Sequence, residues 1–166
     1  MFQTVDVAAI SFVPEKFNLE ANSDRLEEMF RKAAQGGVQL ALAPEGILEG
    51  YVVNQIIDGE VPAKDMKNVA VTMRGAAIRR FRNLAKELGI CLAFGLAEQI
   101  GRNVYNCAVF IDSTGRLCGK YHKMECRVRS TASQVVLLRT VLEELVPHRH
   151  APRVRPGSFA IDLLAG

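Results

Sequence analysis

The spacing of hydrophobic residues near the start of the chain predicts a β-α-β unit. Residues 5–12 (VDVAAISF) are rich enough in apolar and β-branched side chains to form a strand. Residues 26–34 place apolar side chains on one helical stripe, and the glycine pair at 36–37 can end that helix. Residues 38–43 (VQLALA) form a short apolar run, which is typical of a strand buried on both faces of a sheet.

The middle of the chain predicts a long connection followed by a helix. Residues 46–67 follow neither the helical nor the strand period, so we expect a connection that could wall a pocket. A helical stripe then predicts a helix from about Met66 or later to Leu88. Its cations are Arg74, Arg79, Arg80, Arg82 and Lys86. We interpret them as a solvated outer face rather than a nucleic-acid site, because no aromatic platform is interleaved with them.

Two further strand patterns lie close together and predict a hairpin. Residues 90–99 (ICLAFGLAEQ) and 104–112 (VYNCAVFID) are joined by four residues that include Gly101. So short a link between two strands indicates an antiparallel pair. Residues 117–124 (LCGKYHKM) predict another strand that carries a cluster of cations.

One carboxylate follows the second predicted strand directly. Pro44 has no N–H to give to a strand ladder, so the strand stops there and Glu45 stands at its carboxyl end. Ligands of open α/β sheets gather at the carboxyl ends of the strands, which makes Glu45 a candidate functional residue. Taken alone, Glu45 is better explained as a carboxylate that leaves the core for solvent, because most glutamates are exposed.

Composition indicates one soluble globular domain. The chain has 166 residues, of which 49% are apolar and 23% charged. A net charge of +3 gives no strong case for nucleic acid or an anionic membrane as partner. No apolar run approaches the roughly 20 residues that span a bilayer, and no signal-peptide pattern opens the chain. We therefore expect a cytoplasmic protein.

The four cysteines indicate reduced thiols. Cys91, Cys107, Cys118 and Cys126 include no C-x-x-C pair, so neither a zinc site nor a disulfide framework is suggested. The segment His148–His150 has two imidazoles but no third ligand near it, so we interpret it as a loop. No metal and no cofactor are expected.

Four stretches together resemble one family. They are VDVAAISF, the strand ending in ALAPEG, the pair FGLAEQIGRNVYNCAVFIDSTG, and GKYHKM. In this order, over roughly residues 5–124, they resemble the carbon–nitrogen hydrolase (nitrilase and amidase) superfamily. The resemblance implies an α/β fold, here a partial α-β-β-α sandwich, and assembly as a homo-oligomer through outer helices. It also implies catalysis by a Glu, a Lys and a Cys.

The resemblance assigns two of the three catalytic positions. Glu45 matches the family's glutamate, and Lys123 matches the lysine of its Tyr-Arg-Lys stretch, with Tyr121 preserved and His122 where Arg is usual. Lys120 is the competitor for the lysine role. A thiolate would attack an amide or nitrile carbon, with Glu45 moving the proton and Lys123 stabilising the developing charge. We expect Glu45 and Lys123 to meet at neighbouring strand tips.

The third catalytic position has no match. The family's nucleophile lies in a Gly-x-x-Ile-Cys strand a few tens of residues after the lysine, and Cys126 follows Lys123 by only three positions. We therefore divide the chain into residues 1–125, the N-terminal part of a hydrolase domain, and residues 126–166, a divergent tail that is helical or disordered. Truncation or a change of reading frame after about residue 125 would explain the departure. Within the tail, residues 133–146 predict a helix.

Two functions follow from these observations. One is hydrolysis of a non-peptide C–N bond in a small amide, carbamoyl or nitrile substrate, with the cysteine nucleophile absent from this chain. The alternative is a catalytically inactive remnant that acts as an interaction or oligomerising module. A nucleotide-binding domain and a serine hydrolase are unsupported, because the sequence contains none of their glycine-rich motifs.

Overall fold

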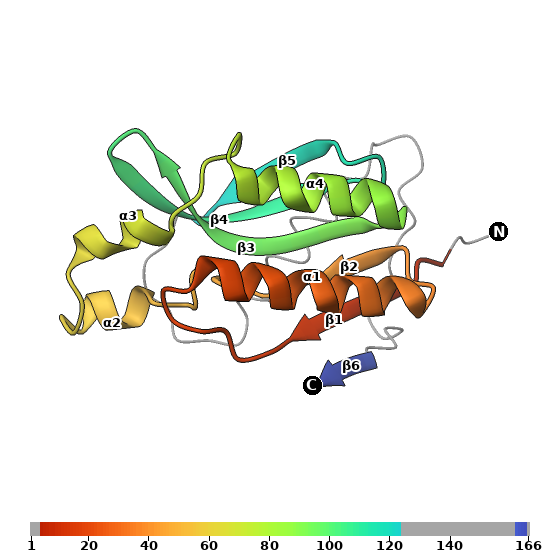
Figure 1. The fold of residues 1–166 in the computed structure, drawn as a ribbon, viewed down its shortest axis with the longest axis horizontal. Coiled ribbons are helices and arrows are strands. Elements are labelled where there is room, and N and C mark those ends of the chain that lie inside the picture. Colours follow the sequence, from red (N-terminus) through yellow and green to blue (C-terminus); the bar gives the residue numbers. More distant parts are fainter. Residues whose placement is uncertain (1–3, 124–161, 166) are drawn as a thin grey trace.

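A six-stranded sheet forms the centre of the described part of the chain, residues 4–123 and 162–165 of this computed structural model (Figure 1). The strands are β1 (Val7–Ser11), β2 (Leu40–Leu42), β3 (Cys91–Ile100), β4 (Asn103–Ile111), β5 (Leu117–His122) and β6 (Asp162–Ala165). Their order across the sheet is β5-β4-β3-β2-β1-β6. Neighbours from β6 to β3 pair in parallel, whereas β3, β4 and β5 pair antiparallel.

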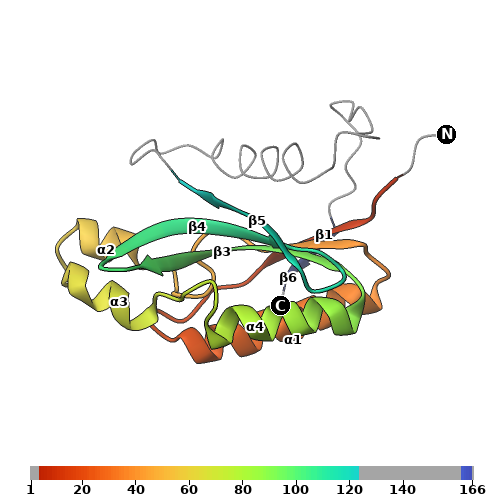
Figure 2. The same ribbon diagram turned by 90° about the horizontal axis from the view of Figure 1, so that it is seen from above.

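Helices cover one face of this sheet. Helices α1 (Leu19–Gln35) and α4 (Ala76–Leu88) lie side by side on it, as the turned view shows (Figure 2). The shorter elements α2 (Val53–Ile57), a 3-10 turn (Ala63–Asp65) and α3 (Met66–Val69) lie together beyond one end of these two helices. This arrangement confirms the α/β class and supplies one helical layer and one sheet.

The predicted β-α-β unit and hairpin are both confirmed. The side chain of Asn18 caps α1 by accepting the N–H of Ala21, and Gly37 follows the helix with a φ of 80°. β1 and β2 pair in parallel on either side of this helix in sequence. β3 and β4 pair antiparallel across the short link at Gly101. These elements form where the sequence predicts them because their signals are local.

The helix predicted from about Met66 or later to Leu88 begins only at Ala76, as α4, and ends at Leu88 as expected. The segment between α3 and α4 is extended and bonds to β3: the N–H of Val71 donates to Ala97 O at 2.9 Å, and the N–H of Gln99 donates to Val71 O at 2.8 Å. Gly75 then precedes α4 as its N-cap residue. Pairing with the sheet therefore outweighs the helical pattern before Gly75, and this glycine is the local signal against one continuous helix.

Three phenylalanines join the helices to the sheet. Phe30 of α1, Phe81 of α4 and Phe94 of β3 are at most 1% exposed. Their ring centroids lie 6.0 Å (Phe30 to Phe81), 6.1 Å (Phe30 to Phe94) and 4.7 Å (Phe81 to Phe94) apart, and the Phe30–Phe81 pair is edge to face. The apolar stripes of both helices thus meet the same strand, and this contact fixes the helical layer on the sheet.

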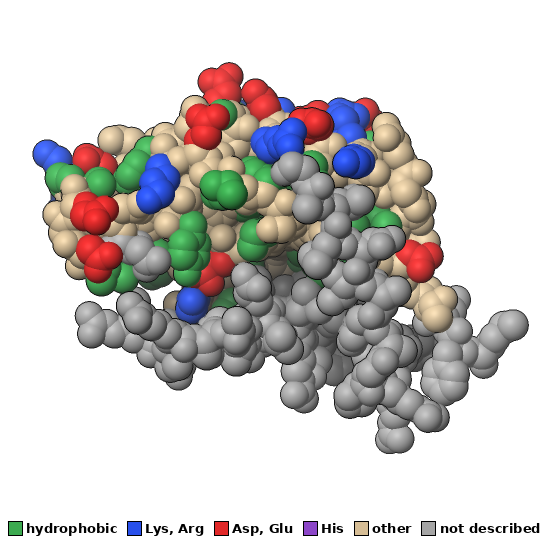
Figure 3. Space-filling model, turned by 90° about the horizontal axis from the view of Figure 1, so that it is seen from below, with side chains coloured by type: hydrophobic (Ala, Val, Ile, Leu, Met, Phe, Trp, Pro, Cys, Tyr) green, Lys and Arg blue, Asp and Glu red, His purple; other side chains and the backbone are tan. Residues whose placement is uncertain are grey.

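Ion pairs join the two helices outside this core. Arg80 of α4 contacts Glu27 at 2.6 Å and Asp24 at 2.7 Å on α1. Arg31 of α1 contacts Glu27 and, across the seam, Glu87 of α4 at 2.6 Å. Acidic and basic side chains lie interleaved along the upper edge of Figure 3. The predicted basic face of α4 is therefore partly used to hold α4 against α1.

Most of the predicted divergent tail lies outside the described residues. This applies to the helix expected over residues 133–146, to Cys126 and to the segment His148–His150. Residues Asp162–Ala165 form β6 and pair in parallel with β1. Within the described residues, the helices are too short or too polar to cross a membrane.

Truncating the central aromatic ring should weaken the fold strongly. We expect Phe94→Ala to lower the free energy of unfolding by about 3–5 kcal/mol, because Phe94 is 1% exposed and contacts both helices. Val13→Ala is the matched control: Val13 is 96% exposed, so the change should stay within about 0.5 kcal/mol. Urea denaturation of the three proteins measures both values. Equal losses in the two variants would contradict this account of the core.

Candidate functional site

The chain crosses over β3 directly after β2. The N–H of Ala43 donates to Ala93 O at 2.8 Å, and the N–H of Gly95 donates to Pro44 O at 3.1 Å. A Cβ on Gly95 would lie 2.4 Å from the Cα of Glu45, so the crossing needs a residue without a side chain at this position. The crossing carries Glu45 past β3 toward β4 and β5.

Glu45 lies against an amide and an ammonium from those two strands. Its Oε1 accepts a hydrogen bond from Asn106 Nδ2 at 2.7 Å, and Lys123 Nζ lies 3.1 Å from Oε2 and 3.3 Å from Oε1. The backbone N–H of Lys123 donates to Asn106 O at 3.0 Å, so Asn106 contacts both charged residues. We call these three residues the Glu45–Asn106–Lys123 group.

The expected meeting of Glu45 with Lys123 is thus confirmed, but its expected route is wrong. β2 and β5 are not neighbours, because β3 and β4 lie between them in the sheet. The contact depends on the crossing at Gly95, which shifts Glu45 sideways. The side chains of Glu45 and Lys123 are 21% and 36% exposed, so solvent reaches the pair.

Strand alternation separates Lys123 from its competitor. β4 and β5 pair Val109 with Lys120 and Cys107 with His122, and both β4 residues are buried. Lys120 and His122 therefore share a face with them, whereas Lys123 bonds to Asn106 at the next position. Lys120 Nζ lies 2.6 Å and 2.8 Å from the carboxylate oxygens of Glu98 instead. Geometry thus favours Lys123 as the partner of Glu45.

A second carboxyl group supports the loop that follows Glu45. Glu49 is 7% exposed, and its Oε2 accepts the N–H of Ala97 on β3 at 3.1 Å. Burial raises the pKa of Glu49, and the nearby charge of Glu45 adds to this, while the backbone N–H groups of Glu49 and Ala97 act in the opposite direction. No motif in the sequence marks Glu49, Asn106 or Gly95 as functional. The hairpin register pairs Asn106 with Ala97, and this pairing is the signal that could have placed Asn106 on the face of the site.

None of the three cysteines in the described part forms a hydrogen bond with the group, and Cys107, the neighbour of Asn106 in sequence, lies on the opposite face of the sheet. Cys118 Sγ lies 3.2 Å from Asp112 Oδ2, beyond the far end of β4. Burial raises the pKa of Cys91, Cys107 and Cys118, and for Cys107 burial together with Glu98 raises it to about 12. Nucleophilic cysteines need a lowered thiol pKa, so these raised values disfavour a nucleophilic role for the three thiols.

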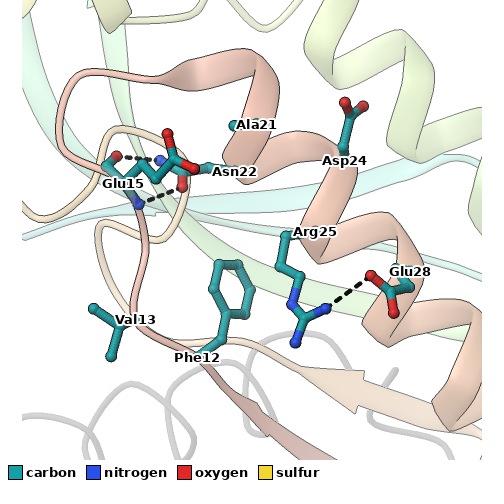
Figure 4. A pocket seen from close by; sticks show the side chains of 8 residues that line it. All are labelled: Phe12, Val13, Glu15, Ala21, Asn22, Asp24, Arg25 and Glu28. Carbon is teal, nitrogen blue, oxygen red and sulfur yellow. Dashed lines mark hydrogen bonds and ion pairs between the residues drawn. The ribbon is translucent and has the colours of Figure 1, made fainter. Parts of the chain in front are cut away.

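A surface hollow lies elsewhere, between the end of β1 and the start of α1 (Figure 4). Its lining residues are Phe12, Val13, Glu15, Ala21, Asn22, Asp24, Arg25 and Glu28. Three internal bonds order its polar groups: Glu15 N–H donates to Asn22 Oδ1, Asn22 Nδ2 donates to Glu15 O, and Arg25 donates to Glu28 (Figure 4). Neither Glu45 nor Lys123 lines it, so the hollow is separate from the candidate site.

Residues 6–157 match the family model of carbon-nitrogen hydrolases. The match therefore extends past residue 125. Over 117 residues the chain is 26% identical to a bifunctional nitrilase/nitrile hydratase from Lupinus angustifolius, and the aligned region covers 65% of this chain and 33% of that protein. Over 129 residues it is 26% identical to an aliphatic nitrilase from Rhodococcus rhodochrous, covering 74% of this chain and 35% of that protein. The chain thus spans about a third of the length of these relatives.

Solved structures show the same fold. A mutant of an amidase from Nesterenkonia sp. AN1, in complex with butyramide, superposes with a TM-score of 0.57 at 24% sequence identity. The likeness covers 77% of this chain and 46% of the amidase. The predicted fold, a partial sandwich of the nitrilase type, is therefore confirmed for the part of the chain that the structure describes.

A methyl group at the crossing should disturb the site. We expect Gly95→Ala to lower the free energy of unfolding by about 1–3 kcal/mol, because its Cβ would lie 2.4 Å from the Cα of Glu45 and 2.9 Å from Pro44 O. Gly36→Ala is the control, since its Cβ would come no closer than 3.1 Å to a neighbour. Chemical denaturation compares the two. A variant at position 95 as stable as the wild type would show that the crossing tolerates a side chain.

The buried carboxyl of Glu49 should make stability depend on pH. Because its pKa is raised in the folded state, its stabilising contribution is complete below the ordinary value of 4.5 and is lost as the pH rises through the folded value. Glu49→Gln removes this proton equilibrium while keeping an oxygen for the N–H of Ala97. The difference in unfolding free energy between variant and wild type should therefore grow in favour of the variant as the pH rises.

Urea denaturation at steps from about pH 4 to about pH 8 measures that difference. Glu60→Gln serves as the control, because Glu60 is exposed and its replacement should leave the pH profile unchanged. A constant difference between Glu49→Gln and the wild type over this range would refute the prediction.

Proposed function

We propose that this chain, which belongs to the carbon–nitrogen hydrolase family, carries the Glu and Lys of a Glu-Lys-Cys site that cleaves a non-peptide C–N bond. The proposed substrates are small amides, carbamoyl compounds or nitriles. The observation that carries the proposal is the contact of Glu45 with Lys123, two residues 78 positions apart in sequence. We extend the proposal to a cytoplasmic homo-oligomer, as the sequence led us to expect.

The geometry suits an acid–base role for Glu45. In the proposed reaction a thiol loses its proton to Glu45, and the thiolate attacks the amide carbon. Glu45 then gives the proton to the departing nitrogen, which leaves a thioester. Water attacks this thioester while Glu45 accepts its proton; the C–S bond breaks, the carboxylic acid leaves, and Glu45 returns the proton to the released thiolate. The hydrogen bond from Asn106 holds Oε1 of Glu45 and leaves Oε2 beside the ammonium.

Lys123 suits the stabilisation of negative charge. Attack on an amide or nitrile carbon moves negative charge onto the substrate oxygen or nitrogen, and an ammonium fixed in advance stabilises it. Lys123 is held by the bond of its own N–H to Asn106 O and is 36% exposed. The proposed reaction requires no metal and no cofactor.

The cysteine nucleophile of the proposed reaction is absent from this chain. Cys107 shares a face with Lys120 rather than Lys123, and Cys118 contacts Asp112. The sequence has no counterpart of the family's Gly-x-x-Ile-Cys strand. This position of the cysteines also favours a second candidate function, a catalytically inactive module that binds copies of itself or another protein.

Ammonia release from a panel of short aliphatic amides and nitriles tests the proposal, with and without an added small thiol such as 2-mercaptoethanol. We expect thiol-dependent release that falls about 100- to 10,000-fold in Glu45→Gln and in Lys123→Met. Glu28→Gln is the matched control, because its side chain is 65% exposed on α1. Release that persists without added thiol and disappears in Cys126→Ser would support hydrolysis but place the nucleophile inside the chain.

Release equal in the wild type and in Glu45→Gln under both conditions would overturn the hydrolase proposal. Sedimentation of the same samples then examines the second candidate. A mass that rises with protein concentration, together with absent hydrolysis, would support the oligomerising module.

A further inference from the structure

Three strands bring a carboxylate, a thiol and an imidazole together on the helix-covered face of the sheet. Glu98 lies on β3, Cys107 on β4 and His122 on β5, and one ligand atom of each lies within 4.8 Å of the others. The register explains the cluster: Cys107 pairs directly with His122, and its other neighbour, Leu96, is two residues before Glu98. Alternation puts this cluster on the opposite face from Glu45 and Lys123.

The three donors are of the types that bind zinc. Zinc takes carboxylate oxygen, thiolate sulfur and imidazole nitrogen at about 2.0–2.3 Å, which places tetrahedral ligand atoms about 3.3–3.8 Å from one another. His122 Nε2 lies 2.5 Å from Glu98 Oε2, so this pair must separate by about 1 Å to admit an ion. The two pairs that include Cys107 Sγ lie within 4.8 Å, an upper limit that includes the required spacing.

Burial and access also fit a bound cation. Glu98 is 3% and Cys107 1% exposed, whereas the side chain of His122 is 30% exposed. An ion can therefore enter past the imidazole, and water can fill a fourth position on that side. The ring of Tyr105 stacks on His122 with centroids 5.1 Å apart and holds its plane.

Lys120 competes with a cation for the carboxylate of Glu98. Its Nζ contacts both oxygens of Glu98, at 2.6 Å and 2.8 Å. Metal binding would leave Oε1 with Lys120 and take Oε2, while Cys107 loses its proton to solvent. The carboxylate and the thiolate together neutralise a divalent cation. Lys120 remains as a hydrogen-bond donor to Glu98, and carboxylates that bind metals commonly accept such a bond.

We propose that Glu98, Cys107 and His122 bind a zinc ion or a similar divalent cation. The site ties β3, β4 and β5 together on the face away from the Glu45–Asn106–Lys123 group. It takes no part in the proposed hydrolysis and stands independently of it. Without a metal the same residues form an ion-pair cluster around Glu98. The experiment must therefore distinguish a metal site from this ion-pair cluster.

Cobalt titration of the metal-stripped protein tests the site. Co²⁺ in place of Zn²⁺ gives a thiolate-to-cobalt absorption band in the near ultraviolet, and we expect this band to saturate at one ion per chain and to vanish when Zn²⁺ is added. Cys107→Ser should abolish the band. His122→Gln and Glu98→Gln should weaken cobalt binding by at least about tenfold. Cys91→Ser and Cys118→Ser are the matched controls and should retain the band.

Thermal unfolding shows whether a variant that binds no cobalt is still folded. Zinc should raise the unfolding temperature of the wild type and leave that of His122→Gln unchanged, because an ion that binds only the folded state stabilises it. His122 is the most exposed of the three ligands, so its replacement disturbs the core least. A cobalt band that survives in Cys107→Ser, or the absence of any band in the wild type, would overturn the proposal and leave an ion-pair cluster only.

Discussion

The close approach of the chain to Gly95 is the constraint on which the candidate site depends. A Cβ there would lie 2.4 Å from the Cα of Glu45, so the chain can cross β3 only because position 95 has no side chain. Without the crossing, Glu45 would stay above β2, with two strands between it and β5. The same approach is fixed by the bond from Gly95 N–H to Pro44 O, so one glycine both admits and anchors the loop.

Strand alternation then sorts the charged residues into two groups. β5 ends with Lys120 and His122 on the helix-covered face and delivers Lys123 next to Asn106. A shift of one residue in the pairing of β5 would exchange the faces and send Lys123 toward Glu98. The buried carboxylate of Glu98, which holds Lys120 and His122, opposes such a shift. The cluster on one face therefore supports the register on which the other face depends.

The sequence predicts what is local and misses what depends on tertiary approach. α1 and the β3–β4 hairpin follow from spacing and glycine positions close to them in the chain. The late start of α4 results from Val71 bonding to β3, a contact that the local pattern does not contain. Glu45 stands out by its place at the carboxyl end of a strand and Lys123 by the family resemblance, whereas no pattern marks Glu49 within residues 46–67. Glu98, Cys107 and His122 form no motif, because three strands supply them.

The two carboxyl groups of the loop have different surroundings, and this bears on how Lys123 is used. Glu49 is buried, accepts the N–H of Ala97 and has a raised pKa, which favours its neutral form. A shift toward the neutral form weakens the repulsion between the carboxyl groups of Glu49 and Glu45. Were both carboxylates charged, their repulsion would favour a loop that moves Glu45 away from Glu49, and hence from Asn106. Burial of Glu49 thus helps to keep Glu45 where Lys123 can reach it.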